Sequence, residues 1–186
     1  QAQTGDLIFF HGTTSMGRVI ELTGLYSHVA MVIILPDSEK TVLVCEAQQS
    51  VGVRCITVER LFTDYWADNK SFGGRAFVFR PRQPLSLVEQ DTLYRSAINL
   101  MGSLYSNDHI KKMVLRWIDY HLSHHDQRPI LEPEYNHLVC SEATLLWFHS
   151  INRTLPYDLH YGDYTPSSEA TSEDLDVTAE LSLPAG

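Results

Sequence analysis

Ser27-His-Val-Ala-Met-Val-Ile-Ile-Leu35 is a nearly continuous run of β-branched and apolar residues, which is typical of a buried strand. Pro36-Asp-Ser-Glu-Lys40 follows as a polar turn, and Thr41-Val-Leu-Val-Cys-Glu-Ala-Gln48 has the pattern of a returning strand. If the turn centres on Ser38, residues equally distant from Ser38 lie opposite one another. The sequence therefore predicts an antiparallel hairpin with a defined register.

Two ionisable residues, His28 and Glu46, interrupt this apolar hairpin. In the predicted register position 30 lies opposite Glu46, so His28 and Glu46 are diagonal neighbours on one face of the sheet. A carboxylate in the middle of a buried strand needs a polar neighbour, whereas a histidine in an apolar strand is more often a satisfied core residue than a catalytic one. A shift of one residue would separate the pair. Gln48 shares the face of Glu46 and is the alternative partner.

Further strands and helices are predicted on both sides of the hairpin. Short apolar runs bounded by turn residues predict strands over residues 5–10, 51–58 and 75–80. From Ser86 onward the apolar residues recur at helical spacing, and Ser86-Leu-Val-Glu89 is a capping-box pattern that opens a helix ending near Met101. Helices are also predicted over residues 13–23 and 108–125. Most strands precede most helices, which predicts an α+β domain with helices packed against an antiparallel sheet.

A cysteine stands at the start of the last predicted helix. The segment Asn136-His-Leu-Val-Cys-Ser-Glu-Ala-Thr-Leu-Leu-Trp-Phe-His-Ser150 contains Cys140 and, after it, apolar residues at helical spacing. A thiol in the first turn lies at the positive end of the helix dipole and beside unpaired backbone N–H groups, which stabilise a thiolate. Cys140 is therefore either a nucleophile or a small buried hydrophobic residue. Its partners decide between these alternatives.

His28, Glu46 and Cys140 together have the residue types of a base, an orienting group and a nucleophile. Cys140 would attack a carbonyl carbon, His28 would take up and return the proton, and Glu46 would fix the tautomer of the imidazole. The backbone N–H of Cys140 would be one donor to the oxyanion. The set predicts a thiol acyl-transfer enzyme.

Four short motifs follow one another along the chain: Gly5-Asp-Leu-Ile-Phe-Phe10, Ser27-His-Val-Ala-Met-Val32, Cys45-Glu-Ala47 with Gly52-Val53, and Val139-Cys-Ser-Glu142. In type and order they resemble the permuted papain-like, NlpC-type family of cysteine amidases and peptidases, in particular its YiiX-like branch. In that family the cysteine comes late in the chain, the reverse of the order in papain. The resemblance spans about residues 4–166 and implies a circularly permuted papain-like fold. It implies Cys140 as nucleophile, His28 as base and Glu46 as orienting group.

The same resemblance sets the expected domain organisation. Residues 1–166 are expected to form a single catalytic domain, and residues 167–186 a flexible acidic tail. Gly102 with Tyr105-Ser106 is similar to a loop beside the family's substrate pocket, which makes Tyr105 a candidate substrate-binding residue. The resemblance implies no cofactor.

Composition and charge limit the classes of partner. With 186 residues and 44% hydrophobic content, the chain has the size and composition of one globular domain. Its net charge is −9, and residues 167–186 carry five acidic side chains and no cation. The chain therefore offers no basic surface for nucleic acid, and it has no run of about 18 apolar residues to span a membrane. It begins with Gln1 rather than Met, which leaves a removed signal peptide, the localisation and the oligomeric state open.

The remaining cysteines and a group of histidines invite other interpretations. Cys45 and Cys55 lie on either side of a predicted turn, so they could face each other across a hairpin, but two free buried thiols are expected unless the protein is exported. His121, His124 and His125 have the spacing of zinc ligands, and they equally suit the C-terminal end of a helix. The sequence pattern places no carboxylate or cysteine ligand with them, so no metal site is expected.

Three functions are compatible with these residues. The leading hypothesis is a cysteine hydrolase that cleaves an amide bond in a small peptide-like substrate. A lipid acyltransferase or phospholipase with an acyl substrate and the same three residues is an alternative, although lecithin retinol acyltransferase relatives have an Asn-Cys-Glu-His context where this chain has Val-Cys-Ser-Glu. A binding module that keeps the fold without turnover is the third. The presence of both Cys140 and His28 argues against this third alternative.

Overall fold

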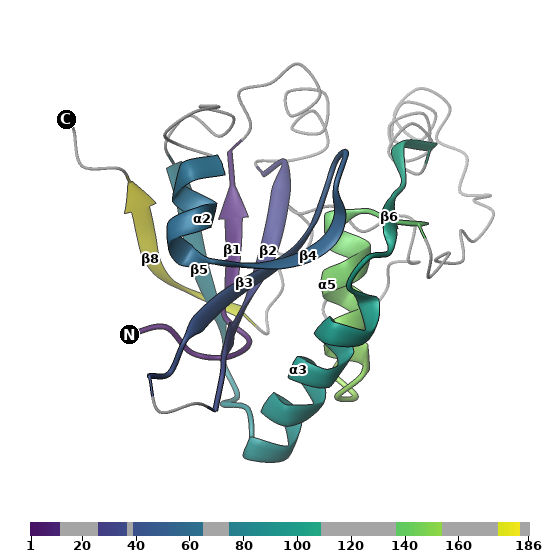
Figure 1. The fold of residues 1–186 in the computed structure, drawn as a ribbon. Coiled ribbons are helices and arrows are strands. Elements are labelled where there is room, and N and C mark those ends of the chain that lie inside the picture. Colours follow the sequence, from purple (N-terminus) through teal and green to yellow (C-terminus); the bar gives the residue numbers. More distant parts are fainter. Residues whose placement is uncertain (12–25, 37–38, 65–74, 109–136, 154–174, 183–186) are drawn as a thin grey trace, which may run out of the picture.

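The computed structural model describes residues 1–11, 26–36, 39–64, 75–108, 137–153 and 175–182. Its centre is a six-stranded antiparallel sheet with the strand order β4-β3-β2-β1-β5-β8 (Figure 1). The strands are β1 (Leu7–Phe10), β2 (His28–Ile34), β3 (Val42–Gln48), β4 (Gly52–Thr57), β5 (Arg75–Pro81) and β8 (Leu175–Ser182). The described helices are α2 (Val58–Phe62), α3 (Leu87–Leu100) and α5 (Cys140–His149), and β6 (Leu104–Tyr105) and β7 (His137–Leu138) form a short parallel pair.

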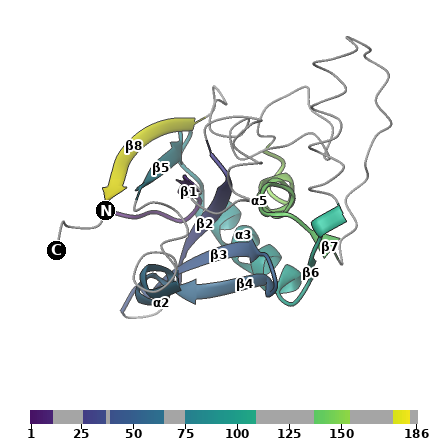
Figure 2. The ribbon, with the colours of Figure 1, turned by 90° about the horizontal axis from the view of Figure 1, so that it is seen from above.

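The two faces of the sheet pack against different helices, as the view from above in Figure 2 shows. Successive residues of a strand point to opposite faces. One core cluster accordingly joins Phe9 of β1 to Leu93 of α3 and Trp147 of α5. A second cluster joins the neighbouring Phe10 to Leu61 of α2. This arrangement confirms the predicted α+β class with helices packed against an antiparallel sheet.

The β2–β3 hairpin has the predicted register. Met31 lies opposite Cys45 and Val32 lies opposite Val44, so paired residues are equally distant from position 38. All five strands predicted from the sequence are present. β4 ends at Thr57, because the Thr57 hydroxyl accepts a hydrogen bond from the backbone N–H of Arg60 at 3.3 Å and caps α2.

The predicted capping box at the start of α3 is also present. The Ser86 hydroxyl accepts from the backbone N–H of Glu89 at 3.3 Å, and the Glu89 carboxylate accepts from the backbone N–H of Ser86 at 2.7 Å. Arg153, which follows α5, donates from Nε to the same carboxylate at 2.7 Å. Hydrogen bonds from Arg153 and Ser86 lower the pKa of Glu89 to about 2. The start of α3 and the end of α5 are thus linked, which holds the two helices together.

The helices predicted over residues 13–23 and 108–125 fall largely or wholly outside the described residues, as do His121, His124 and His125. Among the helices that the structure describes, none combines the length and apolar character needed to cross a membrane.

Cys45 and Cys55 form a disulfide, so the expectation of two free thiols is wrong. The physical reason is the register of the β3–β4 hairpin, which places the two cysteines directly opposite each other with their Cα atoms 4.0 Å apart. Cys140 is the remaining, free cysteine. The chain therefore has a single thiol, because it contains three cysteines in all.

Residues 175–182 differ from the expected flexible tail, because they form β8 at the edge of the sheet. Two acidic residues of this segment meet cations near β5: Glu180 lies 3.0 Å from Arg75, and Asp176 lies 2.9 Å from Arg82. The buried Leu175 packs into the core at the start of the strand. The acidic composition is thus partly compensated across the strand pair. The division of the chain at residue 166 stays a prediction.

Candidate active site

Cys140 is the first residue of α5, directly after the extended residue Val139. The Glu142 carboxylate accepts a hydrogen bond from the backbone N–H of Val139 at 2.9 Å, which fixes the turn that leads into the helix. The helix packs on β2, β3 and α3, and its residues from Cys140 to Phe148 are all buried. The thiol is therefore held at the positive end of a core helix.

His28 is the first residue of β2, and its side chain lies between Glu46 and Cys140. Its Nε2 lies 2.7 Å from Oε2 of Glu46, as the predicted register requires. The Cys140 thiol acts on the same ring through its charge and a hydrogen bond. Burial alone would lower the pKa of His28, but the charge and hydrogen bond of Cys140, together with Glu46, raise it from 6.5 to about 10. The imidazole is therefore protonated at neutral pH.

Glu46 is completely buried, and each of its oxygens has a partner. Oε2 faces His28, while Oε1 accepts from Nε of Arg54 at 2.8 Å and lies 2.7 Å from Nη2 of the same guanidinium. Nη1 of Arg54 lies 2.9 Å from Asp64, which in turn lies 2.8 Å from Nε of Arg60. A line of alternating charges thus leads from the buried site to the exposed Arg60. This line compensates the buried carboxylate, which would otherwise be costly to ionise.

Arg54 is the site residue that the sequence pattern did not reveal. A signal for it exists, because Glu46 and Arg54 are equally distant from position 50 in a tight turn, and the β3–β4 register places them opposite each other. An arginine inside the run Val53-Arg-Cys-Ile56 also needs a buried partner, as Glu46 does. Matching the two would have identified the pair.

Tyr105 belongs to β6 and lies near Cys140. It is paired with Leu138 of β7, two residues before the cysteine. Hydrogen bonds between the backbones of Val53 and the turn at residues 102–103 tie β6 to β4. Burial, followed by the negative charges of Cys140 and Glu142, raises the pKa of Tyr105 well above its usual value. The phenol therefore keeps its proton and can donate a hydrogen bond beside the thiol.

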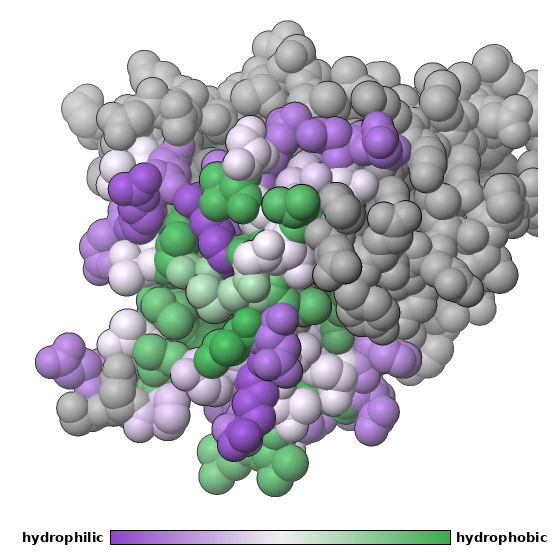
Figure 3. Space-filling model, turned by 45° about the vertical axis from the view of Figure 1, so that its right-hand side comes forward, coloured by the Kyte–Doolittle hydropathy of each residue, from purple (hydrophilic) through white to green (hydrophobic). Residues whose placement is uncertain are grey.

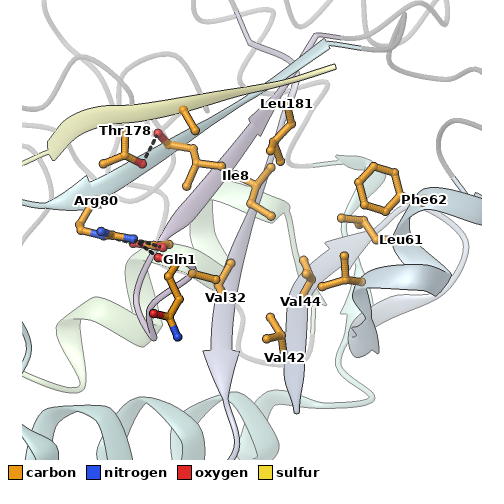
Figure 4. Close-up of a pocket in the computed structure, with 15 residues that line it drawn as sticks. Gln1, Ile8, Val32, Val42, Val44, Leu61, Phe62, Arg80, Thr178 and Leu181 are labelled. Carbon is orange, nitrogen blue, oxygen red and sulfur yellow. Dashed lines mark hydrogen bonds and ion pairs between the residues drawn. The ribbon is translucent and has the colours of Figure 1, made fainter. Parts of the chain in front are cut away.

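An apolar cavity lies elsewhere in the molecule. It has a volume of about 380 Å³ and lies on the α2 side of the sheet, where apolar side chains surround it and Arg80 stands at its edge (Figure 4). Its apolar lining includes Ile8, Val32, Val42, Val44, Leu61, Phe62 and Leu181. Cys140, His28, Glu46 and Tyr105 are all absent from this lining, so the cavity is separate from the candidate site.

Exposed apolar residues also occur on α3, on the turn after it and on β6, on the side of the molecule that Figure 3 brings forward. They are Leu87, Val88, Ile98, Met101 and Leu104. The candidate site residues are not among them, because Cys140, His28 and Glu46 are buried.

Comparison with known proteins identifies a family and a similar fold. Residues 1–113 match the family described as permuted papain-like amidase enzyme, YaeF/YiiX, C92 family. This segment contains His28, Glu46 and Tyr105, and Cys140 lies beyond it. The fold is similar to the crystal structure of metalloprotein yiiX from Escherichia coli O157:H7, with 19% sequence identity, 99% of each chain covered and a TM-score of 0.65. No curated protein matches the sequence. The family match covers more than half of the chain, and the protein therefore belongs to the permuted papain-like amidase family of YaeF and YiiX.

Proposed function

We propose that the protein is a cysteine hydrolase that cleaves an amide bond in a peptide-like substrate through a thioester on Cys140. Membership of an amidase family supports the general class of reaction. The observation that carries the proposal is the position of the His28 ring, which contacts the buried Glu46 carboxylate and interacts with the Cys140 thiol. Thiol acyl transfer needs a nucleophile, a base and a group that orients the base.

In the proposed reaction, His28 moves a proton between the thiol, the leaving amine and water. In the resting enzyme this proton comes from the thiol, which leaves a thiolate beside an imidazolium. The sulfur attacks the carbonyl carbon, and the C=O electron pair moves onto oxygen. When the intermediate collapses, the imidazolium gives its proton to the amine nitrogen, the C–N bond breaks and a thioester remains. Water then transfers a proton to the neutral imidazole as it attacks the thioester, which releases the acid and restores the ion pair.

Two donors are proposed for the oxyanion. The first is the backbone N–H of Cys140, which lies in the first turn of α5, where N–H groups have no intrahelical acceptor. The second is the Tyr105 hydroxyl, because its raised pKa keeps it protonated and because it lies close enough to Cys140 to respond to its charge. Tyr105 would thus contact the substrate at the reacting carbonyl.

A lipid substrate is the less supported alternative. A long acyl chain needs an apolar pocket next to the nucleophile, and the apolar cavity of about 380 Å³ that the described residues form is lined by residues other than the candidate site residues. The two substrates give opposite results in one assay. Release of fatty acid from a phospholipid, with no action on peptide amides, would favour the lipid alternative.

The yiiX protein is described as a metalloprotein. In the described ranges of this chain no group of three or more His, Cys, Asp or Glu side chains is arranged to hold a metal ion. His121, His124 and His125 lie outside those ranges. The proposal accordingly uses only the side chains of the chain itself.

The first test is the rate of alkylation of Cys140 by iodoacetamide, followed by mass spectrometry between about pH 5.5 and 9. No other cysteine has to be replaced, because Cys45 and Cys55 are bonded to each other. A thiolate paired with His28 should react at about pH 6.5 at least tenfold faster than an ordinary cysteine thiol. Labelling no faster than that of a small-molecule thiol would overturn the proposal.

The second test is hydrolysis of a set of fluorogenic peptide amides by the parent, Cys140→Ala and His28→Gln. Both variants should lose turnover, because each removes a group that reacts. His149→Gln is the matched control, since His149 stands at the opposite end of α5 from the thiol, and this variant should keep the parent rate. Equal loss in all three variants would point to damage to the helix rather than to loss of the reacting groups.

A further inference from the structure

We infer that Arg54 is a positioning residue that controls the charge of the Cys140–His28 pair, although it contacts neither the substrate nor the thiol. The inference rests on the proposed function. By neutralising Glu46, the guanidinium leaves the positive charge of the His28 imidazolium available to the Cys140 thiolate.

The two carboxylate oxygens of Glu46 contact different cationic side chains. Oε1 contacts Arg54 through Nε at 2.8 Å and lies 2.7 Å from Nη2, whereas Oε2 contacts Nε2 of His28 at 2.7 Å. Glu46 has no exposed surface, and the side chain of Arg54 is only 16% exposed. Water therefore cannot substitute for the guanidinium at this carboxylate.

A count of charges shows why this matters. The reactive state needs a thiolate on Cys140 and an imidazolium on His28, and it places them beside the buried Glu46 carboxylate. Without Arg54, one imidazolium would have to compensate two anions in a poorly solvated site, and the thiolate would take up a proton. Arginine stays protonated in proteins. With Arg54 present, two cations face two anions.

Other charged and titratable groups surround Arg54 and the Cys140–His28 pair. Asp64, which follows α2, lies 2.9 Å from Nη1 of Arg54 and could cancel its charge, but Arg60 lies 2.8 Å from the second oxygen of Asp64. From β6, Tyr105 keeps its proton. From α5, Glu142 adds a further negative charge, which the backbone N–H of Val139 partly compensates and which is the same with or without Arg54. Asp64 thus orients the guanidinium, and Arg60 compensates Asp64.

The disulfide keeps this contact in register. Glu46 lies opposite Arg54 in the β3–β4 hairpin, and the neighbouring pair, Cys45 and Cys55, is covalently joined. A slip of one residue would turn Arg54 to the other face of the sheet. The bond prevents such a slip at the position next to the ion pair.

The test compares the pH dependence of Cys140 alkylation in the parent, Arg54→Met, Glu46→Gln and the double variant. Arg54→Met should label at least about tenfold more slowly than the parent near pH 6.5. The double variant should return to within about threefold of the parent, because it lacks the anion that needed compensation while the Gln oxygen can still accept from His28. Arg54→Lys keeps the charge but loses part of the guanidinium contacts with Glu46 and Asp64, so its labelling rate should lie between those of the parent and Arg54→Met.

Arg80→Met is the matched control. Arg80 also pairs with a buried carboxylate, Asp6, at 2.7 Å, but none of the histidines that the structure describes shares that carboxylate. This variant should label like the parent. If Arg54→Met does not fold, Arg54→Gln takes its place in the cycle, because it also removes the positive charge and should label at least about tenfold more slowly than the parent.

The outcomes separate this inference from the proposed function. Slow labelling of the parent would overturn both. Fast labelling of the parent, together with an unchanged profile in Arg54→Met or with additive effects of the two substitutions, would overturn the role of Arg54 and leave the proposed function standing.

Discussion

Two buried carboxylates pair with arginines in this sheet, and they differ in how their oxygens are used. Asp6 accepts from Arg80 with both oxygens, at 2.7 and 2.8 Å, and Oδ2 also accepts from the backbone N–H of Gln3; Figure 4 shows Arg80 at this contact. Glu46 gives one oxygen to Arg54 and the other to His28. Arg80 occupies both oxygens of Asp6, and we call this the closed pair. Arg54 occupies one oxygen of Glu46 and leaves the other to contact His28, and we call this the open pair. The first arrangement holds the fold, and the second is suited to chemistry.

The largest expected effect comes from breaking the open pair. Glu46→Ala removes the acceptor that orients the His28 ring, so turnover of a peptide amide should fall by about a thousandfold. Asp6→Ala should leave turnover at the parent level wherever the protein remains folded, because Asp6 has no contact with the imidazole. Steady-state kinetics on both variants make the comparison. Equal loss of turnover in the two variants would show that both carboxylates serve only the fold.

The closed pair should instead determine stability. Arg80→Met leaves the 1% exposed Asp6 carboxylate without its guanidinium, which should lower the free energy of unfolding by about 3 kcal/mol. Chemical denaturation of the variant and the parent measures this difference. The kcat of the folded variant should stay unchanged. A change of less than about 0.5 kcal/mol would mean that water replaces the guanidinium at Asp6.

The protonation of His28 sharpens the comparison, because a histidine shares the carboxylate of Glu46 and none of the described histidines shares that of Asp6. In the parent the imidazole should titrate near pH 10, and in Cys140→Ala its pKa should fall, since burial then opposes Glu46 without help from the thiolate. NMR of the imidazole nitrogens provides the measurement. A midpoint that does not move when the thiol is removed would show that Glu46 alone holds the proton.

The raised pKa of His28 also makes the free energy of unfolding depend on pH. The folded protein holds the His28 proton between about pH 6.5 and 10, where the unfolded chain has released it. The contribution of His28 to the free energy of unfolding is therefore full below about pH 6.5 and is lost as the pH rises through about 10. Denaturation of the parent and His28→Gln at both ends of this window isolates the contribution.

The smallest expected effect concerns the hydroxyl of Tyr105. Tyr105→Phe removes one proposed donor to the oxyanion and should lower kcat by about tenfold, with little change in KM, because the interaction forms mainly in the transition state. Tyr94→Phe, on α3, is a matched control that should keep the parent kcat. A change confined to KM would place Tyr105 in substrate binding alone.

Much of the fold and of the site followed from local patterns. The β2–β3 register could be predicted because strands alternate faces and the turn is short, and the contact between His28 and Glu46 follows directly from that register. Cys140 was identifiable because an apolar helical pattern begins beside it. These features depend on neighbouring residues or on one hairpin.

The features that were missed depend on distant residues or on the chemical environment. Glu180 meets Arg75, which lies 105 positions away, so no local pattern could show that the acidic segment forms a strand. The bond between Cys45 and Cys55 follows from register, but whether facing thiols are oxidised depends on the compartment. The five-residue helix α2 is too short for a periodic pattern and depends on the Thr57 cap.

The position of β8 also bears on self-association. Every residue of β5 has a partner in β8, so the backbone N–H and C=O groups on that side of β5 are covered. The side chains of residues 176–180 are exposed, and they include Asp176 and Glu180. Negative charges along an edge strand discourage a second copy from adding to the sheet. A protein cut at residue 166 would present the uncovered edge of β5 instead, and we expect it to aggregate through strand pairing.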